Sequence, residues 1–256
     1  MSILDAIILG IVQGLTEWLP VSSSGHLVIF QELFSIKAGI SFDLAVHLGT
    51  LLVVFVYFWR DIVRIAKAIG TWDYESEYFR LGIYVLLASV VTGVFGVLFY
   101  EQVSKIFSNA LIVGILLVIN GLFLILVSNK MGWTNIDWVK SLIIGFGQAV
   151  SILPGISRSG ATIGSAMLAD VRREEAFRFS FLLSIPAIIG ANLYSLSVEE
   201  FVFDVNVVVG IIFAFVFGYL ALIWLRRWLI SGKLKYFGYY CLFIGVITIV
   251  MKTLLF

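Results

Sequence analysis

Apolar residues run in long, nearly uninterrupted stretches along most of this 256-residue chain. An α-helix needs about 20 consecutive apolar residues to cross the hydrocarbon core of a bilayer. Six stretches approach that length and predict membrane-spanning helices over residues 43–60, 79–100, 108–128, 177–197, 205–225 and 236–256. The first and the fourth begin with polar residues, so we expect their outer turns to lie in protein or at the membrane interface.

Two further apolar stretches are interrupted near their middle and do not fit a simple span. One covers about residues 3–34 and is broken at Leu19-Pro20-Val21-Ser22-Ser23-Ser24-Gly25. The other covers about residues 139–169 and is broken at Pro154-Gly155-Ile156-Ser157-Arg158-Ser159-Gly160. Each leaves two helical arms of about 10–17 residues, which suit a re-entrant hairpin. Non-helical backbone at that depth must be covered by protein or line a water-filled cavity.

The two broken stretches are related to each other. An offset of 135 residues aligns Gly10-Ile11-Val12-Gln13 with Gly145-Phe146-Gly147-Gln148, and Ser22-Ser23-Ser24-Gly25 with Ser157-Arg158-Ser159-Gly160. Each hairpin precedes three spans, and because three is odd the second half should enter the membrane upside down. The sequence therefore predicts an all-α polytopic membrane protein with six transmembrane helices and two re-entrant hairpins in an inverted-topology repeat. Residues 1–256 form one membrane domain, with halves 1–130 and 136–256, and in such repeats the site lies at the midplane.

Composition agrees with this class of protein. Apolar residues make up 61% of the chain and charged residues 13%, whereas soluble domains have about 45–50% and about 25%. The net charge of +1 provides no strong field to attract nucleic acid. Membrane lipids are the partners that this composition indicates, and a homo-oligomer is compatible with it.

Lysine and arginine are distributed unequally between the two predicted sides of the membrane. Thirteen lie on one side: Arg60, Arg64, Lys67, Arg80, Lys130, Lys140, Arg172, Arg173, Arg178, Arg226, Arg227, Lys233 and Lys235. Three lie on the other, Lys37, Lys105 and Lys252. Since basic loops stay in the cytoplasm, we expect a multi-pass protein of the cell membrane with both termini outside. The acidic loop at residues 199–204 should also lie outside.

The first break carries several groups that could perform chemistry. Glu17 precedes it, and an ionisable residue inside a membrane needs a partner or a task. Ser22, Ser23 and Ser24 could simply cap the next helix, but with Gly25 they also bring hydroxyls and free amides together as an anion site. His26 lies close by and could be structural or serve in nucleophilic or acid–base chemistry.

The second break carries Arg158, which would be costly to bury without an anion. Its planar guanidinium suits bidentate binding of phosphate, and a salt bridge to Glu17 is the structural alternative. Ser157, Ser159 and Gly160 belong to a second helix start facing the same point. His47, the other histidine, follows Asp43 by one helical turn, and pairing between these two is the favoured interpretation.

At these residues the sequence resembles the undecaprenyl-pyrophosphate phosphatase family, also called the bacitracin-resistance family. Three motifs carry the resemblance, which covers essentially the whole chain: Gln13-Gly14-Leu15-Thr16-Glu17, Pro20-Val21-Ser22-Ser23-Ser24-Gly25-His26, and Pro154-Gly155-Ile156-Ser157-Arg158-Ser159-Gly160-Ala161-Thr162. The resemblance implies hydrolysis of a polyprenyl pyrophosphate to the monophosphate carrier used in cell-wall synthesis. It also implies a divalent cation, Mg²⁺ or Ca²⁺, and a site that opens outward.

The resemblance also suggests roles for individual residues. It points to Ser23 as nucleophile, with His26 or Glu17 accepting its proton and His26 as an alternative nucleophile. Arg158 and the two helix starts would hold the pyrophosphate, with Ser22, Ser24, Gly25, Ser157, Ser159 and Gly160 as binding residues. The cation would lie near Glu17, with Gln13 as a further ligand. Members often have Glu at the position of Gln13, so coordination here would have one charge less.

A different class of function is a transporter or flippase that moves a phosphorylated polyprenyl lipid without chemistry. Inverted repeats are typical of secondary transporters, and a fold does not decide a function. The cluster of serine, histidine and glutamate favours the enzyme, because transport alone does not need these groups together.

Overall fold

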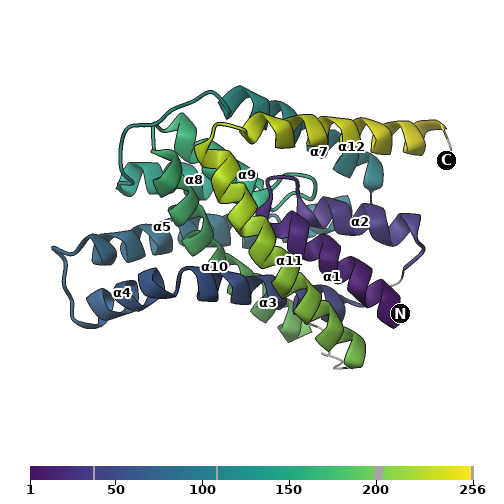
Figure 1. Cartoon of the computed structure of the whole chain (residues 1–256), viewed down its shortest axis with the longest axis horizontal. Coiled ribbons are helices and arrows are strands. Elements are labelled where there is room, and N and C mark those ends of the chain that lie inside the picture. The colour runs from purple at the N-terminus through teal and green to yellow at the C-terminus, as the bar shows by residue number, and fades with distance from the viewer. Residues whose placement is uncertain (37, 108, 199–203, 255–256) are drawn as a thin grey trace.

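The computed structural model describes residues 1–36, 38–107, 109–198 and 204–254, and these are almost entirely helical (Figure 1). In chain order the helices are α1 (Ile3–Trp18), α2 (Ser23–Leu33), α3 (Ile40–Tyr57), α4 (Trp59–Gly70), α5 (Glu77–Leu98), α6 (Tyr100–Phe107), α7 (Ala110–Val127), α8 (Trp138–Val150), α9 (Arg158–Leu168), α10 (Arg173–Val198), α11 (Val205–Ile230) and α12 (Leu234–Leu254). The predicted all-α class is confirmed for the described residues.

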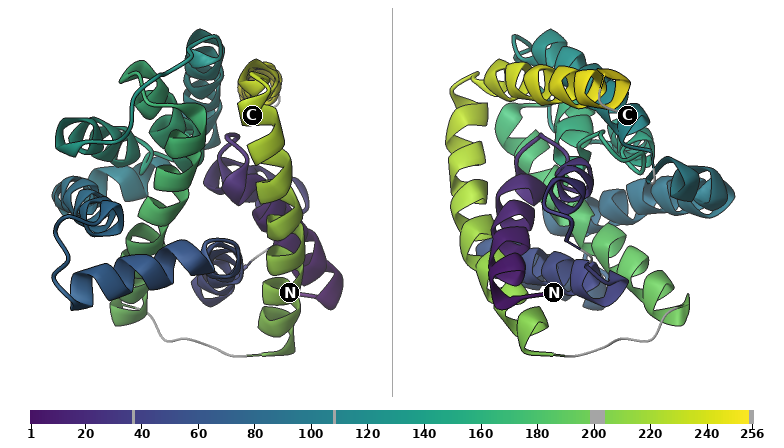
Figure 2. Two further views of the ribbon diagram at one scale, coloured as in Figure 1. Left: turned by 60° about the vertical axis from the view of Figure 1, so that its left-hand side comes forward. Right: turned by 90° about the vertical axis from the view of Figure 1, so that its right-hand side faces the viewer.

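Five of the predicted spans are single long apolar helices, namely α5, α7, α10, α11 and α12. The sixth, expected over residues 43–60, ends at Tyr57 as α3, and the chain then bends by 77° into α4. Figure 2 shows α4 turned sideways from the end of α3. The bend falls where the apolar run meets Arg60 and Asp61. Beyond it α4 is amphipathic, with Arg64 and Lys67 exposed and its isoleucines against α5.

Both broken stretches form pairs of short helices, α1 with α2 and α8 with α9. Each second arm begins with a serine cap that lies within the predicted break. The Ser22 hydroxyl accepts a hydrogen bond from the Gly25 amide at 3.3 Å, and the Ser157 hydroxyl accepts one from the Gly160 amide at 3.2 Å. These caps satisfy amides that the helix itself leaves unpaired, so the same serine signal starts both arms.

The two hairpins enter from opposite ends of the molecule (Figure 1). The outer end of α2 lies beside the C-terminal helix, since Glu32 forms an ion pair with Lys252. The outer ends of α8 and α9 lie at the other end, where the Trp133 and Thr134 amides each donate to the Asp170 carbonyl at 3.0 Å. This arrangement supports the inverted relation of residues 1–130 and 136–256, which stays a prediction.

Small residues allow the hairpins to approach the spans closely. A Cβ added at Gly10 would lie 2.7 Å from the Gly210 carbonyl oxygen of α11. At the matching position of the second hairpin, a Cβ at Gly145 would lie 2.8 Å from the Ala88 carbonyl oxygen of α5. The first arm of each hairpin therefore packs on the second span of the other half, backbone against backbone, as small residues permit in membranes.

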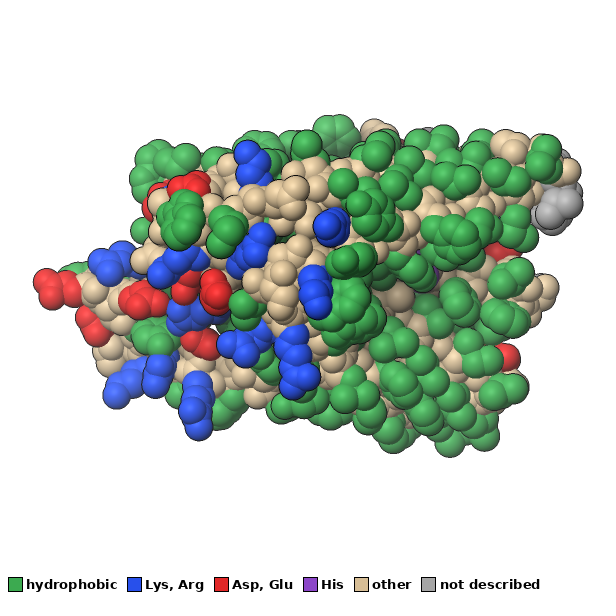
Figure 3. Space-filling model, turned by 45° about the horizontal axis from the view of Figure 1, so that its top comes forward, with side chains coloured by type: hydrophobic (Ala, Val, Ile, Leu, Met, Phe, Trp, Pro, Cys, Tyr) green, Lys and Arg blue, Asp and Glu red, His purple; other side chains and the backbone are tan. Residues whose placement is uncertain are grey.

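Basic side chains gather at the end of the molecule away from both termini (Figures 1 and 3). Some of them also hold helices together there. Arg178 of α10 pairs with Asp61 of α4 at 2.6 Å and with Glu77 of α5 at 2.9 Å. The Arg173 Nη2 donates to the Ser128 carbonyl at 3.0 Å, past the end of α7. The grouping agrees with the side assigned from sequence. Lys37 and residues 199–203 of the acidic loop lie outside the described residues.

The orientation of the chain in the membrane is directly testable. We expect a cysteine placed at Gly232 to react only with reagents that reach the cytoplasm, and a cysteine at Ser2 to react from outside, because basic loops are retained inside. The buried native Cys241 provides the unlabelled background. Accessibility labelling in intact cells and inverted vesicles measures this, position 200 of the acidic loop serves as a second outer site, and the reverse pattern contradicts the assigned orientation.

Candidate active site

The tips of the two hairpins meet and exchange hydrogen bonds. The Ser22 hydroxyl of the first tip accepts from the Gly155 amide of the second at 3.1 Å. The Ser157 hydroxyl of the second tip donates to the Leu19 carbonyl of the first at 3.5 Å. Gly155 has φ +104°, which favours glycine, and a Cβ there would lie 2.7 Å from the Val113 carbonyl oxygen. The starts of α2 and α9 are thereby held next to each other.

Ser23 and Arg158 are the first residues of α2 and α9. The 135-residue offset relates them, so one half places a hydroxyl where the other places a guanidinium. Both are only partly buried, whereas Ser22 and Ser157 behind them are buried. Ser23 and Arg158 are thus accessible at the tips, where a ligand could meet a hydroxyl and a guanidinium.

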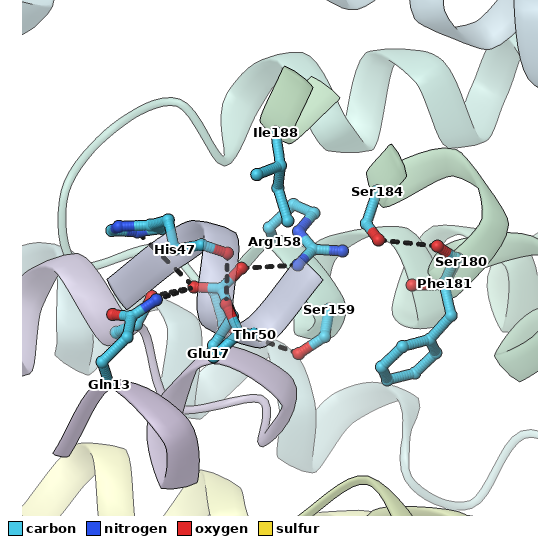
Figure 4. A network of polar contacts seen from close by, with 12 residues as sticks. Gln13, Glu17, His47, Thr50, Arg158, Ser159, Ser180, Phe181, Ser184 and Ile188 are labelled. Carbon is cyan, nitrogen blue, oxygen red and sulfur yellow. Dashed lines mark hydrogen bonds and ion pairs between the residues drawn. The ribbon is translucent and has the colours of Figure 1, made fainter. Parts of the chain in front are cut away.

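Glu17, at the end of α1, contacts both of these residues, and Figure 4 shows its carboxylate beside Arg158 and Gln13. Its Oε2 accepts a hydrogen bond from the Ser23 hydroxyl at 2.6 Å and from the Gln13 amide nitrogen at 3.1 Å. Its Oε1 pairs with Arg158 Nη2 at 2.6 Å. The carboxylate is therefore fixed in orientation, with one oxygen directed at the hydroxyl and the other at the guanidinium.

Arg158 keeps capacity for a further partner. The predicted alternative, a salt bridge to Glu17, is present, and it uses Nη2. Nη1 is buried and has no hydrogen-bond partner among the described residues. The guanidinium also lies over the Trp18 ring, 5.0 Å from its centroid, a contact that limits its movement. A buried N–H without a partner is costly, so Nη1 is the donor that an incoming anion would satisfy.

The remaining predicted binding residues surround the two helix starts. The Ser24 hydroxyl lies 3.3 Å from the Ser22 hydroxyl, and the Ser159 hydroxyl lies 3.1 Å from the Ser157 hydroxyl. Ser159 is fully buried, so it supports its tip from behind, whereas Ser24 is partly exposed. Helix starts offer free amides and a partial positive charge. Two of them beside Arg158 form an arrangement whose charge is complementary to an anion.

His26 turns away from the cluster around Glu17. Its Nδ1 lies 2.8 Å from the Ser22 carbonyl oxygen, and its Nε2 lies 2.8 Å from the Tyr240 hydroxyl of α12. The two rings stack with centroids 5.5 Å apart. Both ring nitrogens thus have partners other than Ser23 and Glu17. The geometry favours Glu17 over His26 as the group that accepts a proton from Ser23.

His47 lies next to Glu17, a position that its sequence context did not predict. Its Nδ1 lies 2.6 Å from the backbone oxygen of Asp43, and its Nε2 lies 3.7 Å from Glu17 Oε2. The Asp43 carboxylate instead accepts a hydrogen bond from Gln31 at 3.3 Å. The pairing expected between the two side chains is therefore replaced by a backbone contact. The proximity of His47 to Glu17 results from the packing of α3 against α1, and no local sequence motif predicts it.

The donor set for a cation is small. Glu17 is the one carboxylate of the cluster, and the described residues contain no group of three or more His, Cys, Asp or Glu side chains placed to hold a metal. The Gln13 Oε1 is buried and without a hydrogen-bond partner in this part of the structure. One carboxylate and one unpaired amide oxygen fit a hard cation that takes most of its ligands from phosphate and water.

Comparison with known proteins extends the resemblance. The family described as bacitracin resistance protein BacA matches residues 6–247. A protein of Methanococcus vannielii named undecaprenyl-diphosphatase is 40% identical, covering 93% of this chain and 96% of that protein. Proteins with the same name from Methanosphaera stadtmanae and Halothermothrix orenii are 37% identical over the whole of both chains and 39% identical over 98% of both.

Proposed function

This chain belongs to the bacitracin resistance protein BacA family, and on that premise we propose that it hydrolyses undecaprenyl pyrophosphate. The products are undecaprenyl monophosphate and inorganic phosphate. This reaction recycles the carrier lipid for cell-wall and glycan synthesis and confers resistance to bacitracin. The substrate is a polyprenyl pyrophosphate held within a multi-pass membrane protein, with its tail between helices and open to lipid.

One observation carries the chemical part of the proposal. The Ser23 hydroxyl lies 2.6 Å from Glu17 Oε2, beside an arginine whose Nη1 has no hydrogen-bond partner among the described residues. A hydroxyl is a weak nucleophile unless an adjacent base takes its proton. The close carboxylate provides that base, and Arg158 provides the charge that phosphoryl transfer requires.

The reaction then has two steps. In the first, Ser23 Oγ bonds to the terminal phosphorus, the anhydride P–O bond breaks, and undecaprenyl monophosphate leaves with the bridging oxygen. Glu17 Oε2 takes the hydroxyl proton. In the second, water attacks the phosphorus of the phosphoserine and the Ser23 Oγ–P bond breaks. Glu17 returns its proton to Ser23 Oγ, and inorganic phosphate leaves with both protons of the water. Direct attack by a water that Glu17 activates gives the same products.

Arg158 and the helix starts hold the substrate during both steps. Arg158 Nη2 keeps its bond to Glu17 while Nη1 donates to the phosphate. The amides at the starts of α2 and α9 bind further phosphate oxygens, with Ser24 at the rim. His26, fixed between Ser22 and Tyr240, supports the first tip rather than reacting.

Glu17 and Gln13 would hold a divalent cation, Mg²⁺ or Ca²⁺. When bound it would supply positive charge that neutralises pyrophosphate oxygens. We propose that the site opens to the outer side of the cell membrane, the side that the distribution of basic residues predicts for both termini. A transporter or flippase is the other candidate, and no observation favours it over the enzyme.

The decisive experiment is phosphate release by purified protein in detergent micelles. We expect inorganic phosphate to appear from undecaprenyl pyrophosphate, to stop on addition of a chelator, and to resume with excess Mg²⁺. Arg158 and the two helix starts alone leave much of the pyrophosphate charge uncompensated, and Glu17 adds a further negative charge. Undecaprenyl monophosphate serves as the control substrate. Movement of the intact pyrophosphate lipid across the membrane of proteoliposomes, without phosphate release, would instead identify a transporter. Phosphate release that is unchanged by a chelator would show that the reaction needs no divalent cation.

A further inference from the structure

Asn120 of α7 contacts both hairpin tips. Its side chain is 1% exposed. The amide nitrogen donates to the Pro20 carbonyl of the first tip at 3.1 Å, and the amide oxygen accepts from the Ser157 amide of the second tip at 3.1 Å. Pro20 precedes the cap of α2 by two residues, and Ser157 is the cap of α9. One side chain thus joins both irregular segments immediately before the residues that carry the chemistry.

The chemistry of the side chain matches this position. Irregular backbone within a membrane has peptide groups that cannot find water. Pro20 presents a carbonyl without a helical partner, and Ser157 presents an amide. A carboxamide is a side chain that offers a donor and an acceptor together, and in Asn120 both are used. Cys241 of α12 lies on the same carbonyl, with Sγ 3.6 Å from the Pro20 oxygen and 3.4 Å from the Asn120 amide nitrogen.

Asn120 differs from the other contacts between the tips. The pairs Ser22–Gly155 and Ser157–Leu19 join one hairpin directly to the other, so they move with the hairpins. Asn120 belongs to a span, and α7 packs closely along α12, where a Cβ at Gly121 would lie 2.7 Å from the Gly238 carbonyl oxygen. Asn120 therefore fixes both tips to this pair of spans, whereas Cys241 and Tyr240 of α12 contact only the first tip.

We propose that Asn120 is a positioning residue that sets the relative placement of Ser23 and Arg158 by clamping the two hairpin tips to α7. This inference deepens the proposed function and rests on it. Ser23 attacks a phosphorus atom that Arg158 holds, so the two tips must keep a fixed separation. A displacement of about 1 Å away from the reacting atoms costs about 10²-fold in rate. Loss of the clamp is therefore expected to lower kcat in a protein that still folds.

Asn192 of α10 is a matched control. It is also a buried asparagine within a span, 5% exposed. Its amide nitrogen donates to the Ile188 carbonyl of its own helix at 2.8 Å, and its amide oxygen has no partner among the described residues. A change at Asn192 removes a buried amide of the same size without touching either tip.

The test compares Asn120→Leu and Asn192→Leu in the full-length protein, with Asn120→Ala as the second variant if the leucine protein does not fold. We expect kcat for phosphate release to fall about 10²-fold in the Asn120 variants and to be unchanged in Asn192→Leu. Hydrogen exchange measured by mass spectrometry should rise in the Asn120 variants only in peptides that contain residues 19–23 and 153–158.

Two results would overturn the proposal. One is wild-type kcat in a folded Asn120 variant. The other is exchange that rises equally along α7 and α12, which indicates general loss of packing. Hydrogen exchange can be measured whether or not the protein is catalytically active. If the wild-type protein releases no phosphate, the proposed function fails, while the exchange pattern still reports whether Asn120 clamps the tips.

Discussion

Arg158→Ala is expected to lower kcat/KM for phosphate release by about 10³-fold, the scale of an arginine that stabilises a transferring phosphoryl group. Arg158 places a cation at the hairpin tips, and its Nη1, which has no partner among the described residues, is available for phosphate. Arg158→Lys should fold and turn over slowly, because one ammonium cannot bond Glu17 and a phosphate oxygen with the planar geometry of a guanidinium. Steady-state phosphate release by each purified variant measures both effects.

The alternative explanation for Arg158 is that it only neutralises Glu17 through their ion pair. A double mutant distinguishes this role from phosphate binding. If Arg158 only neutralises Glu17, then Arg158→Ala combined with Glu17→Ala should recover stability and still bind the pyrophosphate lipid tightly. Melting temperature and lipid affinity are measured for both single variants and the pair. Tight binding in the double variant refutes phosphate binding by Arg158. Arg226→Ala, an exposed arginine at the basic end, is the control and should behave as the wild type.

Ser23→Ala should also reduce turnover by about 10³-fold or more, because it removes the nucleophile while leaving the carboxylate in place. Glu17→Gln should lower turnover by about 10²-fold or more, since an amide cannot take the proton. Both proteins should fold. Acid quenching during turnover of a substrate labelled in the terminal phosphate should trap the label on the Ser23 peptide in the wild type and leave it absent in Ser23→Ala.

The control for Ser23→Ala is Ser89→Ala on α5, whose hydroxyl donates to the Val85 carbonyl of its own helix at 2.7 Å. It should retain full turnover. Near wild-type turnover in Ser23→Ala, without label on the protein, would contradict covalent catalysis and leave water activated by Glu17 as the nucleophile. Full turnover in Glu17→Gln would remove Glu17 from the mechanism.

Local signals along the chain predicted the long spans and both hairpins, but they did not predict the bend after α3 or the short helices α4 and α6. A span is recognised by its continuous apolar length, and a re-entrant arm by an apolar run too short to cross. Ser22 and Ser157 mark the starts of α2 and α9 because a cap bonds an amide three residues away, within the reach of a local motif. The repeated spacing of these caps also indicated that the two breaks belong together. Glu17 and Arg158 were predicted as site residues because a charged side chain inside a membrane needs a partner or a task. Ser23 was predicted because it lies in the same break as the cap.

Tertiary structure decided how those residues meet. The bond between Glu17 and Arg158 spans 141 positions of the chain, and only the meeting of two hairpins from opposite ends creates it. His26 could have faced Ser23, but α12 brings Tyr240 to its ring. His47 reaches Glu17, and Asn120 reaches both tips, because α3 and α7 pack where they do. Contacts between distant segments depend on how helices pack against one another. The periodicity of apolar residues within one segment does not specify which other helix that segment will contact.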